Sequence, residues 1–214
     1  MIKDLLILLC IHPGRGWVRK RSIIGYALLA AALFELALKG HFRVNGGRIE
    51  ATPANTDDPL LDDLLERLNR LNGKKFSWVL NRLSMNPGKL YRRQMKILES
   101  RRLITVRQLE WMGITWGKRY RVNRVDGLKP VLTEMERVLV YGREPAIRAR
   151  LIIELLGVLG LLGTLFPDGE LRSRSKTRFR EIAKTEFSEQ HPTYAAIRKE
   201  LRNALRRQKA AAHS

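Results

Sequence analysis

The residues of this chain that could do acid–base chemistry are a short run of aspartates: Asp57, Asp58, Asp62 and Asp63. Two carboxylates held close together can act as a general acid and a general base. These acids, however, fall at the predicted start of a helix, where negative charge is favoured by the helix dipole. We therefore interpret the run as a helix start and not as a catalytic pair.

No pattern of metal ligands or of cofactor-binding glycines accompanies them. Zinc sites need His, Cys or carboxylates at matched spacings, and the four histidines are far apart in a sequence without HxxxH or CxxC. Cys10 lies among apolar neighbours, which favours a buried and unreactive thiol. Gly14 and Gly16 form a GxG without the third glycine of a dinucleotide loop. No nucleophile elbow, Walker motif or kinase loop occurs, so the sequence predicts a non-enzyme without metal or cofactor.

Positive charge is the strongest bulk property of the chain. Its 214 residues include 41 Lys and Arg against 21 Asp and Glu, a net charge of +20. Residues 85–124 contain eleven basic and two acidic side chains, and residues 170–214 contain twelve and five. A surface of this kind attracts polyanions, either nucleic acid or the anionic face of a membrane. Charge alone does not choose between them.

A central helix that could position these charges is predicted at residues 23–40. Ile23 to Leu38 is apolar and rich in alanine, which lets neighbouring helices approach, and Lys39-Gly40 is a typical helix end. Sixteen residues rise about 24 Å, less than the ~30 Å hydrocarbon core of a bilayer, and Glu35 would be costly inside it. Residues 151–166 show the same features. We expect two core helices of a helical bundle, not membrane spans.

The remaining segments predict amphipathic helices and short hairpins around this core. Residues 1–11 favour a short core helix over a secretory signal, because no small-residue cleavage site follows. The alternation at 41–50 around Asn45-Gly46-Gly47 indicates a hairpin. Thr56 or Asp57 is expected to cap an amphipathic helix with acids on its polar side. Further helices are expected at 130–141, 146–166 and 194–208.

The predicted fold is thus mainly α, a compact helical core ringed by amphipathic helices with one or two short β-hairpins. The turn at residues 167–169 is the expected boundary between a domain at 1–166 and a basic helical extension at 167–214, packed on the same domain. Residues 76–123 read as helix, helix and hairpin, with strands at 103–111 and 114–122. That order is also the outline of a winged-helix module, which places a basic helix in a DNA groove.

Several motifs occur in an order that resembles the Golgi phosphoprotein 3 family of peripheral membrane proteins. The main ones are LLAAALFELALKGHFRV at 28–44 and PANTDDPLLDDLLERL at 53–68. LLILLCI at 5–11, KLYRRQMKILESRRLI at 89–104 and REPAIRARLIIELL at 143–156 add to the series. The resemblance covers roughly residues 1–166 and fades after Phe166. It implies a mainly helical domain, self-association through a hairpin, and binding of phosphatidylinositol 4-phosphate in a basic pocket that contains a tryptophan.

Carried over residue by residue, the resemblance implies a headgroup site formed by two basic segments. An ungapped alignment places Lys20 at the tryptophan of the family, with Trp17 close by, and Leu29 at an arginine early in the central helix. The arginine pair of the family falls near Gly88 to Arg93. The candidate lipid-binding residues are Trp17, Arg19, Lys20, Arg21, Lys89, Arg92 and Arg93. A phosphate group is held by converging Arg and Lys donors, and we expect the two segments to form one positive patch.

The hairpin at 103–123 is the candidate surface for self-association. It places five large apolar side chains around a two-stranded tip: Leu109, Trp111, Met112, Ile114 and Trp116. An isolated two-stranded ribbon cannot bury all of these alone, and exposed apolar patches mark contact surfaces. We expect the hairpin to project from the body.

Two functions of different class therefore stay open at the level of sequence. The first is a cytoplasmic protein that is peripheral on the cytosolic face of a membrane and binds anionic lipid. The second is a nucleic-acid-binding protein that uses the winged-helix-like segment at 76–123. A pocket beside the helix at 89–101 would favour a headgroup, whereas a protruding helix would favour a DNA groove.

Overall fold

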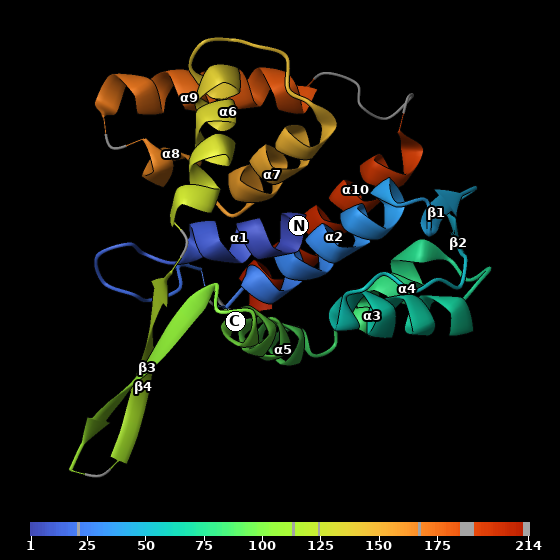
Figure 1. Ribbon diagram of the computed structural model, residues 1–214. Coiled ribbons are helices and arrows are strands. Elements are labelled where there is room, and N and C mark those ends of the chain that lie inside the picture. The colour runs from blue at the N-terminus through green and yellow to red at the C-terminus, as the bar shows by residue number, and fades with distance from the viewer. Residues whose placement is uncertain (21, 113, 124, 167, 185–190, 212–214) are drawn as a thin grey trace.

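Helix α2 (Ile24–Leu38) forms the centre of the computed structural model, which describes residues 1–20, 22–112, 114–123, 125–166, 168–184 and 191–211. This helix is apolar on every face, so it must be covered on every side. Helices α1 (Ile2–Cys10), α3 (Pro59–Arg70), α5 (Pro87–Ser100), α7 (Ile147–Val158) and α10 (Pro192–Ala211) all contact it (Figure 1). Residues 30–36 are buried, whereas Tyr26, Ala37 and Leu38 of α2 are half-buried.

The other elements complete a mainly helical fold, which confirms the predicted fold class. Strands β1 (Phe42–Asn45) and β2 (Arg48–Ala51) form one antiparallel hairpin, and β3 (Ile104–Trp111) and β4 (Ile114–Val122) form another. The remaining helices are α4 (Phe76–Leu83), α6 (Lys129–Leu139), α8 (Leu162–Leu165) and α9 (Gly169–Lys184), with a 3₁₀ turn at Val125–Leu128. Among the described helices, none combines the length and the apolar character needed to cross a bilayer.

The C-terminal half differs from the prediction in one helix. The expected helix at 146–166 is split into α7 and α8, because Gly160 adopts a left-handed conformation with φ +69°. The last helix carries an apolar stripe on its inward face. Ile197, Leu201 and Leu205 are buried in the same core as α2. Helix α10 thereby covers one side of the central helix.

The start of α3 lies one or two residues later than the sequence suggested. Asp58, not Thr56 or Asp57, is the N-cap, and its Oδ1 accepts hydrogen bonds from the N–H groups of Leu60 and Leu61, both at 3.1 Å. Asp57 adopts a left-handed backbone conformation with φ 58° and so cannot begin the helix. The expected capping residue was therefore wrong by one or two positions.

Asp58 also differs from the other acids of this run, because it is buried and takes part in a network of charges. Its Oδ2 lies 2.8 Å from Lys3 Nζ and 3.0 Å from Arg101 Nη2. The Lys3 ammonium is fully buried and also lies 3.0 Å from Asp4 Oδ1. The network joins α1, α3 and α5 beneath the N-terminal turn of α3. Buried charges need such partners, since an isolated one would be strongly destabilising.

Glu35 is the buried carboxyl of the central helix, and its titration gives a testable pH dependence. Its Oε1 accepts a hydrogen bond from the Ile2 N–H group. Burial raises the pKa of Glu35 to about 7, against the lowering effect of Lys3. A carboxyl whose folded pKa lies above its unfolded value of 4.5 loses its contribution to stability as the pH rises from 4.5 to about 7.

The variant Glu35→Gln should therefore gain stability over the wild type as the pH rises through this window. The gain is at most about 3.5 kcal/mol in the free energy of unfolding, from ~1.4 kcal/mol per pKa unit. Urea denaturation of both proteins between pH 4 and pH 8 measures it. A difference in free energy that stays constant over this range would contradict the predicted titration of Glu35.

The hairpin formed by β3 and β4 extends away from the helical body (Figure 1). Its register shifts between Leu109 and Glu110, which marks a bulge near the tip. Four large side chains there are more than two-thirds exposed: Trp111 at 72%, Met112 at 81%, Ile114 at 69% and Trp116 at 68%. The predicted projection of this hairpin is confirmed, and its apolar tip has no partner within the described part of the chain.

Candidate functional site

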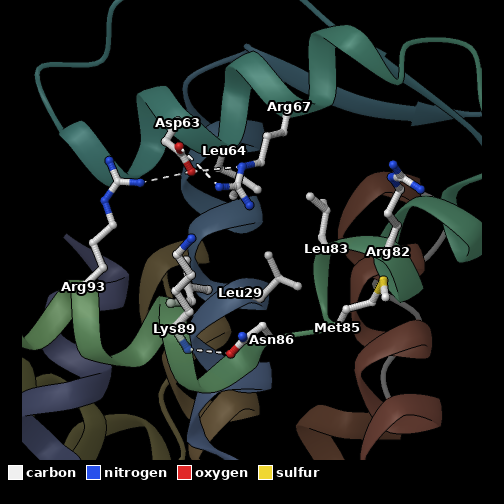
Figure 2. Close-up of a pocket in the computed structure, with 11 residues that line it drawn as sticks. Leu29, Asp63, Leu64, Arg67, Arg82, Leu83, Met85, Asn86, Lys89 and Arg93 are labelled. Carbon is white, nitrogen blue, oxygen red and sulfur yellow. Dashed lines mark hydrogen bonds and ion pairs between the residues drawn. The ribbon is translucent and has the colours of Figure 1, made fainter.

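A pocket of about 300 Å³ opens between α3, α4 and the start of α5, with α2 as its floor (Figure 2). Its walls combine apolar and cationic side chains. The lining residues are Leu29, Asp63, Leu64, Arg67, Arg82, Leu83, Met85, Asn86, Lys89, Leu90 and Arg93. Four of these are basic and one is acidic, so the pocket carries a formal charge of about +3 when all five are ionised.

Local sequence determines how the helices present these residues. In α3 the leucines face the core, and Asp63 and Arg67 lie one turn apart on the opposite side. Asn86 caps α5 by accepting a hydrogen bond from the Lys89 N–H group at 3.1 Å. A side chain at Gly25 would collide with the backbone at the first turn of α5, so this glycine lets α2 and α5 approach closely. The pocket therefore depends on a cap and on a close helix contact.

The two arginines beside α3 share one carboxylate. Asp63 Oδ2 lies 3.1 Å from Arg67 Nε and 3.1 Å from Arg93 Nη1 (Figure 2). Arg93 also donates from Nη2 to the carbonyl oxygen of Pro59 at 2.7 Å. These contacts hold both guanidinium groups in place without using all of their N–H donors, since each guanidinium has five.

The other two cations of the pocket are less restrained. Arg82 is exposed, and its Cζ lies 5.6 Å from the ring centroid of Trp78. Lys89 is exposed and forms no ion pair with the described residues. The pocket thus offers donors from three helices to an anion with several oxygen acceptors. It contains no pair of groups arranged for acid–base catalysis.

Only part of the residue set predicted from the sequence lines this pocket. Lys89 and Arg93 line the pocket, whereas Arg92 is exposed on α5 outside the lining. Trp17 and Arg19 are not among the lining residues, and neither is Lys20. Arg21 lies outside the described residues.

The loop that carries Trp17 makes contacts of its own with β4 and α8. Trp17 stacks on His12 with ring centroids 6.2 Å apart, and the Tyr120 N–H group of β4 donates to the Gly16 carbonyl oxygen at 2.6 Å. Arg19 donates from Nη1 to Thr164 Oγ1 of α8 at 3.2 Å. Contacts with β4 and α8 therefore position this loop.

Sequence reasoning missed Arg67 and Arg82. Each lies on the polar side of an amphipathic helix, where a cation resembles any other solvated residue. One feature of the sequence could have indicated this pocket. Leu29 occupies the position at which the family that the chain resembles has an arginine, and it forms part of the pocket floor. The position at which α2 lacks this arginine thus lies in a pocket whose cations come from α3, α4 and α5.

The same geometry bears on the alternative of a DNA-binding helix. Helix α5 buries Tyr91, Gln94, Met95 and Leu98, and it contacts α2 along its length. Its Lys89 and Arg93 face a pocket shared with α3 and do not form a projecting ridge. The winged-helix interpretation of residues 76–123 therefore gains no support.

Other candidate chemistry is absent from the described residues. They contain no group of His, Cys, Asp and Glu side chains that could hold a metal ion. Cys10 is buried, and its burial raises the pKa of the thiol to about 12, which keeps it protonated at neutral pH.

Comparison with models of known protein families identifies the family of this chain. A family model described as Golgi phosphoprotein 3 (GPP34) matches residues 2–209. The match covers nearly the whole chain and continues past Phe166 through α9 and most of α10. No curated protein sequence matches the chain.

Proposed function

This chain belongs to the Golgi phosphoprotein 3 family, and from that premise we propose that it is a peripheral membrane protein that binds anionic phospholipid headgroups. The binding site is the pocket between α3, α4 and α5. The observation that carries the proposal is the convergence of Arg67, Arg82, Lys89 and Arg93 around one shared hollow. Phosphatidylinositol 4-phosphate, or a lipid with a similar phosphate group, is the proposed ligand.

The chemistry of a phosphate monoester suits these donors. Such a group carries a charge between −1.5 and −2 at neutral pH and offers three strong acceptor oxygens. Arginine can donate to two of them at once through its planar fork, and lysine adds a point charge. Leu29, Leu64 and Leu90 reduce the access of water to the floor of the pocket, which strengthens each charge interaction. Contact of Trp17, Arg19, Lys20 and Arg92 with the same anionic surface stays a prediction.

Co-sedimentation with vesicles tests the proposal. The protein should bind phosphatidylcholine vesicles that contain phosphatidylinositol 4-phosphate and should not bind phosphatidylcholine alone. Binding should be lost at ~1 M salt, because screening shortens the reach of a charge from ~10 Å at 0.1 M to ~3 Å. Equal binding to neutral vesicles, or binding that persists at ~1 M salt, would show that headgroup charge is not the determinant.

We further propose that the β3–β4 hairpin mediates self-association, on the cytosolic face of the membrane where the anionic lipids are presented. Trp111, Ile114 and Trp116 line a shallow apolar hollow at its tip. Pairing two such tips would remove apolar surface from water at about 25 cal/mol per Å².

The variant Trp111→Ser, Ile114→Ser should shift the protein from oligomer to monomer. Both side chains are more than two-thirds exposed, so the fold of the protein should remain. Sedimentation equilibrium at roughly tens of micromolar protein, the range of weak interfaces, measures the mass. A wild type that is monomeric at this concentration would exclude assembly through the hairpin.

A further inference from the structure

The headgroup pocket continues into a second hollow along α3 and α4. This hollow has a volume of about 490 Å³ and is lined by Arg67, Arg70, Leu71, Arg82, Leu83 and Met85. Four of these residues also line the headgroup pocket. The two hollows therefore form one groove, which runs from the start of α5 to the end of α3 and is lined by both cationic and apolar side chains along its whole course.

Two large apolar side chains stand exposed beside this groove. Met85, in the turn between α4 and α5, is 81% exposed, and Trp78 of α4 is 47% exposed. Figure 2 shows Met85 next to Arg82 and Leu83 at the edge of the pocket. Arg82 connects the two, because its guanidinium lies over the Trp78 ring and also lines both hollows. We call Trp78 and Met85 the α4 rim.

Exposed apolar side chains that are surrounded by cations fit one environment well. At a bilayer interface, arginine and lysine reach the phosphates while tryptophan and aliphatic groups lie at the level of the glycerol and upper acyl carbons. Arg67, Arg70 and Arg82 border the same hollow as Leu71, Leu83 and Met85. Each cation thus has an apolar neighbour that would lie deeper in the membrane.

We propose that the α4 rim enters the interfacial layer of the bilayer beside the bound headgroup, with the second hollow over the glycerol and first acyl carbons of that lipid. This inference rests on the proposed headgroup site and adds to it. The protein should therefore bind a headgroup in a membrane with higher affinity than the same headgroup free in solution.

The test compares Met85→Ser with Met85→Leu, which keeps an apolar side chain. Met85→Ser should weaken binding to phosphatidylcholine vesicles containing phosphatidylinositol 4-phosphate by about tenfold, from the lost burial of one apolar side chain. Met85→Leu should bind as the wild type does. Binding of soluble glycerophosphoinositol 4-phosphate, measured by calorimetry, should weaken far less in Met85→Ser than binding to vesicles does, because Met85 lines the pocket but has no hydrogen-bond donor for a phosphate. Tyr141→Ser, which removes a side chain that is 70% exposed at the end of α6, is the matched control and should change neither affinity.

The outcomes separate this inference from the headgroup site. Unchanged vesicle binding in Met85→Ser would overturn the role of the rim and leave the pocket standing. Vesicle binding that depends on Met85 but is indifferent to Lys89→Gln would support the rim and overturn the pocket. A Met85→Ser variant that dissociates an oligomer and keeps its vesicle affinity would assign the rim to a protein contact and overturn the membrane role.

Discussion

Replacing both Arg82 and Lys89 by glutamate is expected to lower the affinity for anionic vesicles on the order of a thousandfold. The two changes alter the charge of the pocket by four units, from about +3 to about −1. At ~1 kcal/mol per charge near an anionic membrane, this amounts to about 4 kcal/mol, or close to three decades of affinity. Both residues are exposed and neither forms an ion pair with the described residues, so the fold should persist.

A second pair of substitutions with the same change in net charge provides the control. Arg180 and Lys184 are exposed on α9, which lies on the other side of the helical body from α3 and α5 (Figure 1). Changing both to glutamate should lower vesicle affinity far less than the pocket pair does. Circular dichroism checks that both variants keep their helical content. An equal loss of affinity in the two pairs would mean that overall charge, and not the pocket, determines membrane binding.

The second large effect concerns folding. Asp58→Ala should lower the free energy of unfolding by about 4 kcal/mol, because it leaves the buried Lys3 with Asp4 as its carboxylate partner and removes the cap of α3. Breaking a buried ion pair costs about 3–5 kcal/mol, and loss of a cap adds ~1 kcal/mol. Chemical denaturation monitored by circular dichroism measures the change. Asp63→Ala, which breaks more exposed ion pairs, is the comparison and should cost about 1 kcal/mol or less.

The same carboxylate should contribute to acid sensitivity. Burial alone would raise the pKa of Asp58, but the hydrogen bond and charge of Lys3, the Leu61 N–H group and Arg101 together lower it. A carboxyl with a lowered folded pKa contributes stability above its unfolded value of ~3.9 and loses it as the pH falls further. The cost of Asp58→Ala should therefore shrink below about pH 4. A cost that is the same at pH 3 and pH 7 would show that charge pairing is not what Asp58 provides.

The core of this protein could be predicted from the sequence because apolar periodicity is a local property. The run from Ile24 to Leu38 has no polar face, so it had to be central, and the Asn45-Gly46-Gly47 segment had to turn. The break between α7 and α8 was harder to foresee. Glycines at 157, 160 and 163 are each compatible with a continuous helix, and only one of them takes the left-handed conformation that ends it.

The candidate site was harder to predict from the sequence because it depends on contacts between segments far apart in the chain. Asp58 is the same residue type as Asp57, Asp62 and Asp63. What distinguishes it is its buried contact with Lys3, which lies 55 positions away in the sequence. The loop that carries Trp17 likewise depends on a distant segment, because the Tyr120 N–H group of β4 donates a hydrogen bond to its Gly16 carbonyl oxygen. Arg67 and Arg82 line the same pocket from α3 and α4, and no local sequence pattern encodes how these two helices pack.

Asp63 gives the proposed pocket an anion of its own. Because its carboxylate already lies between Arg67 and Arg93, the pocket holds four cations in the empty protein with part of their mutual repulsion offset. We expect a phosphate to bind the guanidinium donors that Asp63 leaves unused, so that it would lie beside the carboxylate. Repulsion between the two anions would then reduce the free energy of binding and favour fast release. Such a surface suits a protein that samples a membrane repeatedly and does not settle on it.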